Sequence, residues 1–331
     1  MNCPEYTLAS TRTLNRVFCL LSLLLIIYAG IFSWQSWREE KANRIFNLQN
    51  IMALGSRAID AYFMHLEACM LALNEEIIET DETIDIDTAF HQIKHFKGYH
   101  PELMNICFNR IDGEIMFTAE TPPGNSQPPV TQDPSFQQYS SELQQGNPLR
   151  IGRPIALSDS HGWRIPLRYV INDKEGKPAY IISAHLPIEI LQNYWKDAPF
   201  TQRGALGLIR DDGYLVSRYP IPAQIEMEKI YGIPRKGTLI TYLRQHQFPI
   251  DGSVVGPSGL DGPDYLHTFH RLEHFPITLF IVTPMSDFRS AWWDNVQTPY
   301  FLSAFLLIGG YIVYRFGNAA NERMGNPDSA S

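Results

Sequence analysis

Two apolar runs lie near the two ends of the 331-residue sequence. The first covers residues 17–34 without a charge, and the second covers residues 298–316 and closes on Arg315. About 20 apolar helical residues cross a hydrocarbon core, and tryptophans flank both runs, as at membrane interfaces. The pattern therefore predicts two transmembrane helices. The alternatives are a cleaved signal peptide for the first run and a buried core helix for the second.

The tails outside these runs, residues 1–16 and 317–331, carry arginines such as Arg12, Arg16 and Arg323. Positive charge beside a span favours the cytoplasmic side. We therefore expect both tails in the cytoplasm and the long central segment outside it. In a bacterium this is a two-pass protein of the inner (cytoplasmic) membrane with a periplasmic or extracellular central domain.

Residues 35–80 contain no proline, and their apolar side chains recur at spacings of three and four. This spacing is typical of an amphipathic helix. We predict a stalk helix that continues directly from the first apolar run. A second helix is expected to begin with Asp87 as its N-cap and to run through Phe96.

The apolar period then changes to two, with turns rich in Gly, Asp, Asn and Pro, which indicates strands. The expected strands are 103–109, 114–118, 149–157, 163–172, 179–186, 205–210, 214–218, 265–272 and 277–283. The expected helices begin at Asp133 and cover 188–195, 238–247 and 285–295, and a glycine-rich segment covers 252–262. RIDGEIMF and RDDGYLVS are similar Asp-Gly hairpins and weakly suggest duplication. The fold class is therefore α+β, with two tandem modules, residues 81–198 and 199–297, each with an antiparallel sheet.

The composition narrows the function classes. A net charge of -8 and 44% hydrophobic residues exclude a disordered chain and a nucleic-acid-binding protein. Cys69 and Cys107, the cysteines of the central domain, are either a disulfide or two free thiols, and the helical pattern around Cys69 favours free thiols.

Catalytic and metal-binding patterns are weak. No nucleophile is paired with a base, and no phosphate-binding loop is present, so we expect no enzyme activity in this chain. His91 and His95 lie one helical turn apart, and three histidines follow one another between residues 267 and 274, but neither group completes a metal site. We predict no metal and no cofactor.

Three runs carry a family resemblance: LRIGRPIALSDSHGWRIPLRYVINDKEGKPAYIISAHLPIEIL, GALGLIRDDGYLVSRYPIP and HFPITLFIVTPMSDFRSAWW. Their order between two apolar spans resembles the double Cache (dCache, PAS-like) sensor domain of bacterial transmembrane receptors. The resemblance implies a small ligand bound in the membrane-distal module and a signal passed across the membrane. Such domains precede diguanylate cyclases, histidine kinases or chemoreceptors. About 15 residues follow the second span, so the sequence indicates either a stand-alone sensor or a receptor without its output domain.

In this family the ligand binds on the open face of the distal sheet. The residues expected to line it are Tyr139, Arg153, Trp163, Arg168, Ser183 and His185. An arginine would clamp a carboxylate or phosphate, and an aromatic ring would cover an apolar part. Strand alternation places Arg164 and Arg168 on one face and Trp163 on the other.

The signature of amino-acid-binding members is absent, and His185 stands about where their ammonium-binding Asp would fall. Amino-acid sensing is therefore disfavoured, and His185 would make recognition pH-dependent. The expected partners are a small molecule of unknown class, the membrane, and a second copy of the chain or a signalling protein. The alternative function is a periplasmic scaffold or assembly protein without a small ligand.

Overall fold

The computed structural model describes residues 5–78, 85–124, 149–156, 162–172, 177–196 and 204–325. The chain divides into two compact units. Met1–Phe46 and Met285–Ser331 form the helical unit, and Asn47–Pro284 form the two-sheet unit.

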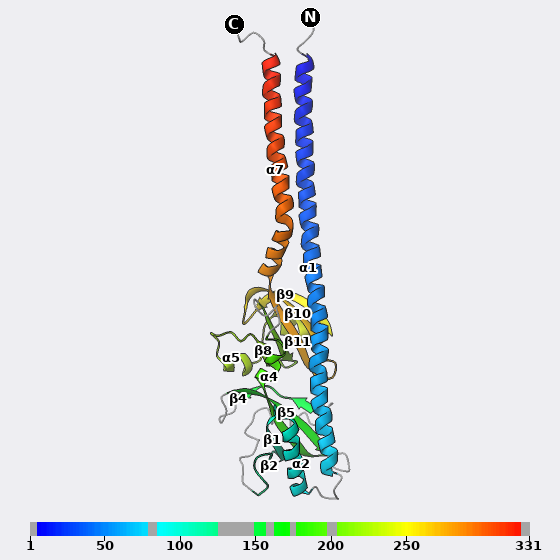
Figure 1. Cartoon of the computed structure of the whole chain (residues 1–331), viewed down its shortest axis with the longest axis vertical. Coiled ribbons are helices and arrows are strands. Elements are labelled where there is room, and N and C mark those ends of the chain that lie inside the picture. The colour runs from blue at the N-terminus through cyan, green and yellow to red at the C-terminus, as the bar shows by residue number, and fades with distance from the viewer. Residues whose placement is uncertain are drawn as a thin grey trace. The chain divides into compact units, whose positions relative to one another are not determined.

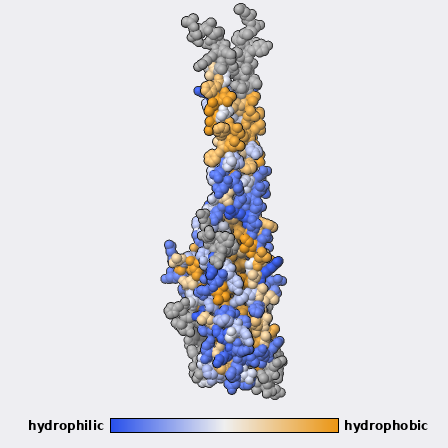
Figure 2. Space-filling model, in the orientation of Figure 1, coloured by the Kyte–Doolittle hydropathy of each residue, from blue (hydrophilic) through white to orange (hydrophobic). Residues whose placement is uncertain are grey.

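The helical unit contains the first part of α1 (Glu5–Ile78) and all of α7 (Met285–Gly325). Both helices are long and apolar enough to cross a membrane. Their apolar side chains face outward, with Leu20 59% and Phe305 72% exposed. Figure 2 shows these side chains as an apolar band near the end that carries both termini. The prediction of two candidate membrane-crossing helices is thereby confirmed.

Within the helical unit the two helices run side by side (Figure 1). The rings of Phe18 and Tyr314 stack with their centroids 5.0 Å apart. Further along, the Trp292 indole Nε1 donates a hydrogen bond of 3.2 Å to the backbone oxygen of Ser33. Aromatic contacts therefore hold the two helices together at both ends of the apolar band.

In the two-sheet unit, the second part of α1 packs one stripe against both sheets. The buried residues of this stripe are Met52, Ser56, Ile59, Asp60, Phe63, Leu66, Met70, Leu73 and Ile77. Their spacing of three and four is that of one helix face, as predicted for residues 35–80. Leu54 also fits the apolar spacing of residues 35–80, but it is 68% exposed and does not join the stripe.

The first sheet has the strand order β2-β1-β6-β5-β3, with β4 also paired to β5. Its strands are β1 (Met104–Arg110), β2 (Ile115–Thr118), β3 (Leu149–Ile151), β4 (Ile155–Ala156), β5 (Trp163–Asn172) and β6 (Pro178–Pro187). The accompanying helices are α2 (Ile86–Tyr99) and α4 (Ile188–Asn193). All neighbouring strands of this sheet pair antiparallel, as predicted.

The second sheet repeats this arrangement in the order β8-β7-β11-β10-β9. Its strands are β7 (Ala205–Arg210), β8 (Leu215–Tyr219), β9 (Asp251–Ser258), β10 (Gly262–Arg271) and β11 (Ile277–Pro284), with helices α5 (Met227–Tyr231) and α6 (Thr238–Gln245). Both sheets begin with an Asp-Gly hairpin in which Gly113 or Gly213 has a positive φ, of 90° or 97°. The common strand order supports the duplication suggested by the two hairpin sequences.

Some sequence expectations were wrong in detail. The strand expected over 149–157 is broken into β3 and β4, because Pro154 has no N–H to donate to a neighbouring strand. The N-cap of α2 is Asp85, two residues before Asp87, and it accepts the Asp87 N–H at 3.1 Å.

The glycine-rich segment contains a strand that the sequence pattern did not reveal. β9 lies at the edge of the second sheet and pairs with β10. A Cβ at Gly256 would approach the Thr238 Oγ1 of α6 to 2.6 Å, and one at Gly252 would approach the Phe269 ring to 2.8 Å. The glycines are therefore required by close packing against α6 and β10. The short helix α5 was also missed.

Candidate functional site

The polar residues of the first sheet gather on the face opposite α1. In the β5–β6 register Arg168 lies beside Ser183, and Pro166 lies beside His185. β1 continues this face, because Cys107 lies beside Ser183. Three of the predicted site residues, Arg168, Ser183 and His185, are therefore neighbours on one surface.

This face contains two charged side chains that are removed from solvent. Arg168 is 2% exposed. Arg164, which precedes it on the same face of β5, is 9% exposed. The Asn109 Nδ2 of β1 donates a 2.8 Å hydrogen bond to the Ser183 hydroxyl. A buried guanidinium is costly unless polar or negative groups accept its protons, so both arginines depend on hydrogen-bond acceptors around them.

The thiol on this face is unreactive. Burial raises the pKa of Cys107 to about 12, so the thiol stays protonated at neutral pH. Cys69 and Cys107 are both free, as the helical pattern around Cys69 indicated, and the disulfide alternative is not realised.

The other predicted residues do not join this group. Trp163 points to the opposite face of β5, and its ring lies 5.6 Å from that of Tyr231 in the second module. Arg153 follows the break after β3 and donates a 3.1 Å hydrogen bond to the Tyr214 hydroxyl. Tyr139 and the helix expected from Asp133 lie outside the described residues.

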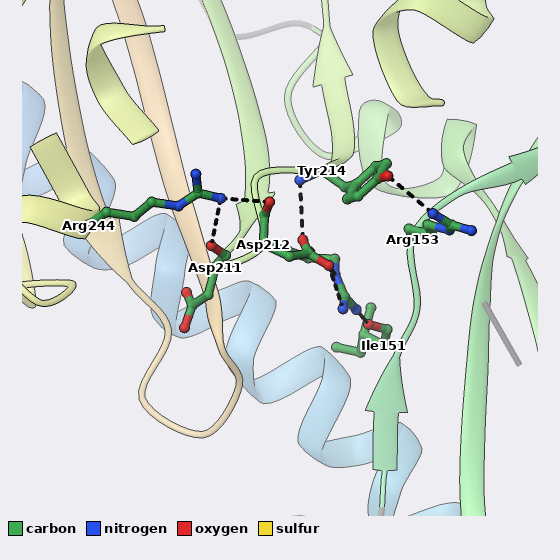
Figure 3. Close-up of polar contacts among 7 residues, drawn as sticks. Ile151, Arg153, Asp211, Asp212, Tyr214 and Arg244 are labelled. Carbon is green, nitrogen blue, oxygen red and sulfur yellow. Dashed lines mark hydrogen bonds and ion pairs between the residues drawn. The ribbon is translucent and has the colours of Figure 1, made fainter. Parts of the chain in front are cut away.

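The Asp211–Tyr214 hairpin joins the two sheets (Figure 3). The Arg210 guanidinium binds the Asp212 carboxylate at 3.0 Å and also contacts the backbone oxygen of Ile151 in the first sheet. The Arg244 Nη2 of α6 donates to the Asp212 backbone oxygen at 2.7 Å. The hairpin thus connects β3, its own strands and α6 through directional contacts.

The second sheet contains a cavity of about 370 Å³ between the sheet, α6 and the β9–β10 turn. Its polar lining includes the buried ion pair of Arg218 with Asp261 and the buried side chain of His267. Burial lowers the pKa of His267, so the imidazole is neutral at neutral pH.

The sequence pattern did not reveal the role of Asn109 or the residues of the cavity. Strand alternation already predicts that Arg164 shares a face with Arg168. Nothing in the local pattern around Asn109, however, indicates its contact with Ser183. The cavity is assembled from segments between Ile209 and Val282 that are distant in sequence, and no spacing pattern joins them.

No family model matches the sequence, and no curated protein matches it either. Solved structures, however, share its fold. The extracellular domain of a protein assigned as a histidine kinase, rpHK1S-Z16, has a TM-score of 0.59 at 15% identity, covering 73% of this chain and 95% of that chain.

Two chemoreceptor domains are also similar. The periplasmic sensory domain of Campylobacter jejuni Tlp1 has a TM-score of 0.55 at 14% identity and covers 75% of this chain and 98% of its own. The ligand-binding domain of Pseudomonas fluorescens CtaA, in complex with L-isoleucine, has a TM-score of 0.55 at 10% identity and covers 77% and 98%. The resemblance to double Cache domains is thereby confirmed at the level of the fold: this chain has the fold of the extracellular sensor domains of histidine kinases and chemoreceptors.

Proposed function

We propose that this chain is a membrane-anchored sensor whose two-sheet unit lies outside the cytoplasm and binds a small ligand. The similar structures are sensor domains of receptors, and CtaA was solved with an amino acid bound. The two candidate membrane-crossing helices flank the two-sheet unit in sequence. The proposal assigns no catalytic step to the chain.

The observation that carries the proposed ligand site is the pair of buried arginines, Arg164 and Arg168, on one face of the first sheet. A guanidinium presents five N–H donors in a planar fork, so it can bind a carboxylate while keeping other contacts. Ser183 and Asn109 add neutral hydrogen-bonding groups beside Arg168. The proposed ligand is therefore a small molecule with a carboxylate or a similar anionic group.

The signal has a direct covalent route out of the two-sheet unit. β11 ends at Pro284, and α7 begins at the next residue. α1 is continuous from Glu5 to Ile78 and lies against both sheets through its buried stripe. A ligand that favours one arrangement of the first sheet would shift α1 relative to α7 as a small piston or rotation.

A thermal-shift screen tests the ligand site on the full chain in lipid nanodiscs. Small carboxylates are added singly, and binding to the native state alone raises the melting temperature. Arg168→Gln is expected to abolish the response. Arg110→Gln is the matched control, because it removes the same charge from an arginine of the first sheet whose side chain is 49% exposed. Ser183→Ala serves as a milder second variant if Arg168→Gln unfolds.

The proposal is wrong if Arg168→Gln and Ser183→Ala both keep the full response of the parent. It is equally wrong if no carboxylate stabilises the parent chain at any concentration while a protein partner binds it constitutively. The latter result is what the scaffold function predicts.

A further inference from the structure

The cavity of the second sheet is independent of the arginine face described above. One wall is formed by α6 and the segment before it, and the opposite wall by β7, β8, β10 and β11. Its apolar lining residues are Ile209, Leu215, Ile233, Leu239, Ile240, Leu260, Phe280 and Val282. A volume of about 370 Å³ lies at the lower end of the range of roughly 300–1,000 Å³ that is typical of small-molecule sites.

A buried ion pair forms one corner of this cavity. Arg218 is 2% exposed, and its Nη2 binds the Oδ1 of Asp261. The other guanidinium nitrogen, Nη1, donates to the Pro220 backbone oxygen at 2.5 Å, and the Ser258 hydroxyl donates to the Oδ2 of Asp261 at 2.5 Å. The single carboxylate among the described lining residues is therefore already paired with an arginine and a hydroxyl.

The lining carries more positive than negative charge. Arg218, Arg235 and Lys236 are cationic and Asp261 is the one acid among the lining residues, which gives three minus one, or +2. Among the described residues, Arg235 donates to backbone oxygens, those of Ile233 and Lys229. Burial, and then the nearby charge of Arg218, lower the pKa of Arg235, as expected where positive charge is in excess.

Two further polar groups lie at the cavity. α6 begins beside it at Gly237, and no side chain caps its first N–H groups. His267 is 3% exposed, and its Nδ1 forms no hydrogen bond with the described residues, whereas its Nε2 lies 3.3 Å from the Gly256 oxygen. The uncapped start of α6 therefore leaves N–H donors beside the cavity that an anionic occupant can use.

We propose that this cavity is a second ligand site, which binds a small monocarboxylate with an apolar chain. The carboxylate would lie between Arg235, Lys236 and the start of α6, where positive charge and free N–H groups converge. The apolar chain of the ligand would pack against Leu215, Phe280 and Val282, whose side chains have no hydrogen-bonding groups.

The charge of the cavity favours monocarboxylates over amino acids and over uncharged ligands. A zwitterionic amino acid would bring an ammonium group into a cavity with excess positive charge, and Asp261 is already held by Arg218 and Ser258. An uncharged chain would fill the apolar part but leave the cations without a counter-charge. A monocarboxylate satisfies both parts of the lining.

The test is calorimetric titration of the full chain in nanodiscs with hexanoate, hexan-1-ol and norleucine as probes. We expect hexanoate to bind at least about tenfold more tightly than either of the others, since losing one ionic contact at a partly buried site costs about a factor of ten or more. Lys236→Gln is expected to weaken hexanoate binding roughly 3- to 10-fold, because Lys236 is exposed and its charge is partly screened.

Three further variants make the result specific. Lys229→Gln removes the same charge from an exposed lysine of α5 that does not line the cavity, and it should bind hexanoate like the parent. Val282→Phe adds a ring to the buried wall and should abolish hexanoate binding to this cavity, whereas Arg110→Gln in the first sheet, whose side chain is 49% exposed, should leave it intact. A normal melting temperature of the Val282→Phe chain shows that it is folded.

The inference is overturned if hexan-1-ol binds as tightly as hexanoate, or if folded Val282→Phe keeps parental affinity. It is also overturned if no heat of hexanoate binding appears up to roughly 10 mM, because that result excludes even millimolar affinity. Because Arg168 belongs to the other sheet, each of these failures leaves the proposed distal ligand site standing.

Discussion

At the residue scale, two histidines attach α1 to the second sheet. The His274 Nδ1 lies 2.6 Å from the Asp60 carboxylate, and the Asp60 Oδ1 also accepts the His274 backbone N–H at 3.2 Å. One turn earlier, the Ser56 hydroxyl lies 2.9 Å from the His270 Nδ1. Asp60 is buried on a face of α1 that is otherwise mostly apolar. Its carboxylate therefore depends on these hydrogen-bonding partners.

The Asp60–His274 pair predicts a pH dependence of stability. The hydrogen bond to Asp60 raises the pKa of His274 above its ordinary value. A raised histidine pKa contributes stability that is complete below about pH 6.5 and is lost as the pH rises through the folded-state value. Asp60→Asn should therefore lower the melting temperature of the full chain more at about pH 6 than at about pH 9. An equal loss at both pH values would contradict this role.

Gly207 of β7 has no space for a side chain. A Cβ there would lie 2.7 Å from the Ser217 backbone oxygen and 2.9 Å from the Phe280 ring. Gly207→Ala should destabilise the protein by about 1–3 kcal/mol, because β7 would have to move away from two neighbouring strands. In Gly98→Ala the new methyl meets nothing within 4 Å, and in urea unfolding this control should match the parent or be more stable. Equal stability of the two variants would refute the packing argument.

At the scale of elements, the hairpin of the second module connects the two sheets. The Arg153 guanidinium lies 5.2 Å from the centroid of the Tyr214 ring and also bonds the ring hydroxyl. Arg210 and Asp212 reinforce the same connection through Ile151. A change in the first sheet can therefore reach β7 and β8 through the hairpin.

A double-mutant cycle measures this connection. Arg153→Ala and Tyr214→Phe should each destabilise the full chain, and the double variant should lose less than their sum by about 0.5–1.5 kcal/mol. The measurement is urea unfolding of the four proteins. Strict additivity would mean that the two side chains do not interact in solution.

The elements also show what the sequence can and cannot predict. The stripe on α1 and the face shared by Arg168, Ser183 and His185 follow from periods of 3.6 and 2, so local patterns were sufficient. The contact of Arg153 was not predictable, because Gly152 and Pro154 interrupt the strand and its partner Tyr214 lies 61 residues away in sequence. β9 was hidden because its glycines serve packing against α6 and Phe269, which only the tertiary structure reveals.

At the scale of the whole molecule, two continuous connections leave the two-sheet unit. α1 runs without interruption from the apolar span to the first sheet, and β11 passes directly into α7. Both connections begin in elements that contact the core. In α1, for example, Phe63 packs against Phe275 with ring centroids 5.6 Å apart. This arrangement is what a sensor needs, provided that the two-sheet unit and the tails lie on opposite sides of a membrane.

Thiol labelling in intact bacteria tests that topology most directly. In a chain whose Cys3, Cys19 and Cys69 are replaced by alanine, the buried Cys107 stays unreactive, and Gln245→Cys places an exposed thiol on α6. We predict that a membrane-impermeant maleimide labels the Gln245→Cys chain in intact cells. A matched chain that retains only Cys3 and Cys107 should be labelled only after lysis. Protection of the Gln245→Cys thiol until lysis would contradict the account.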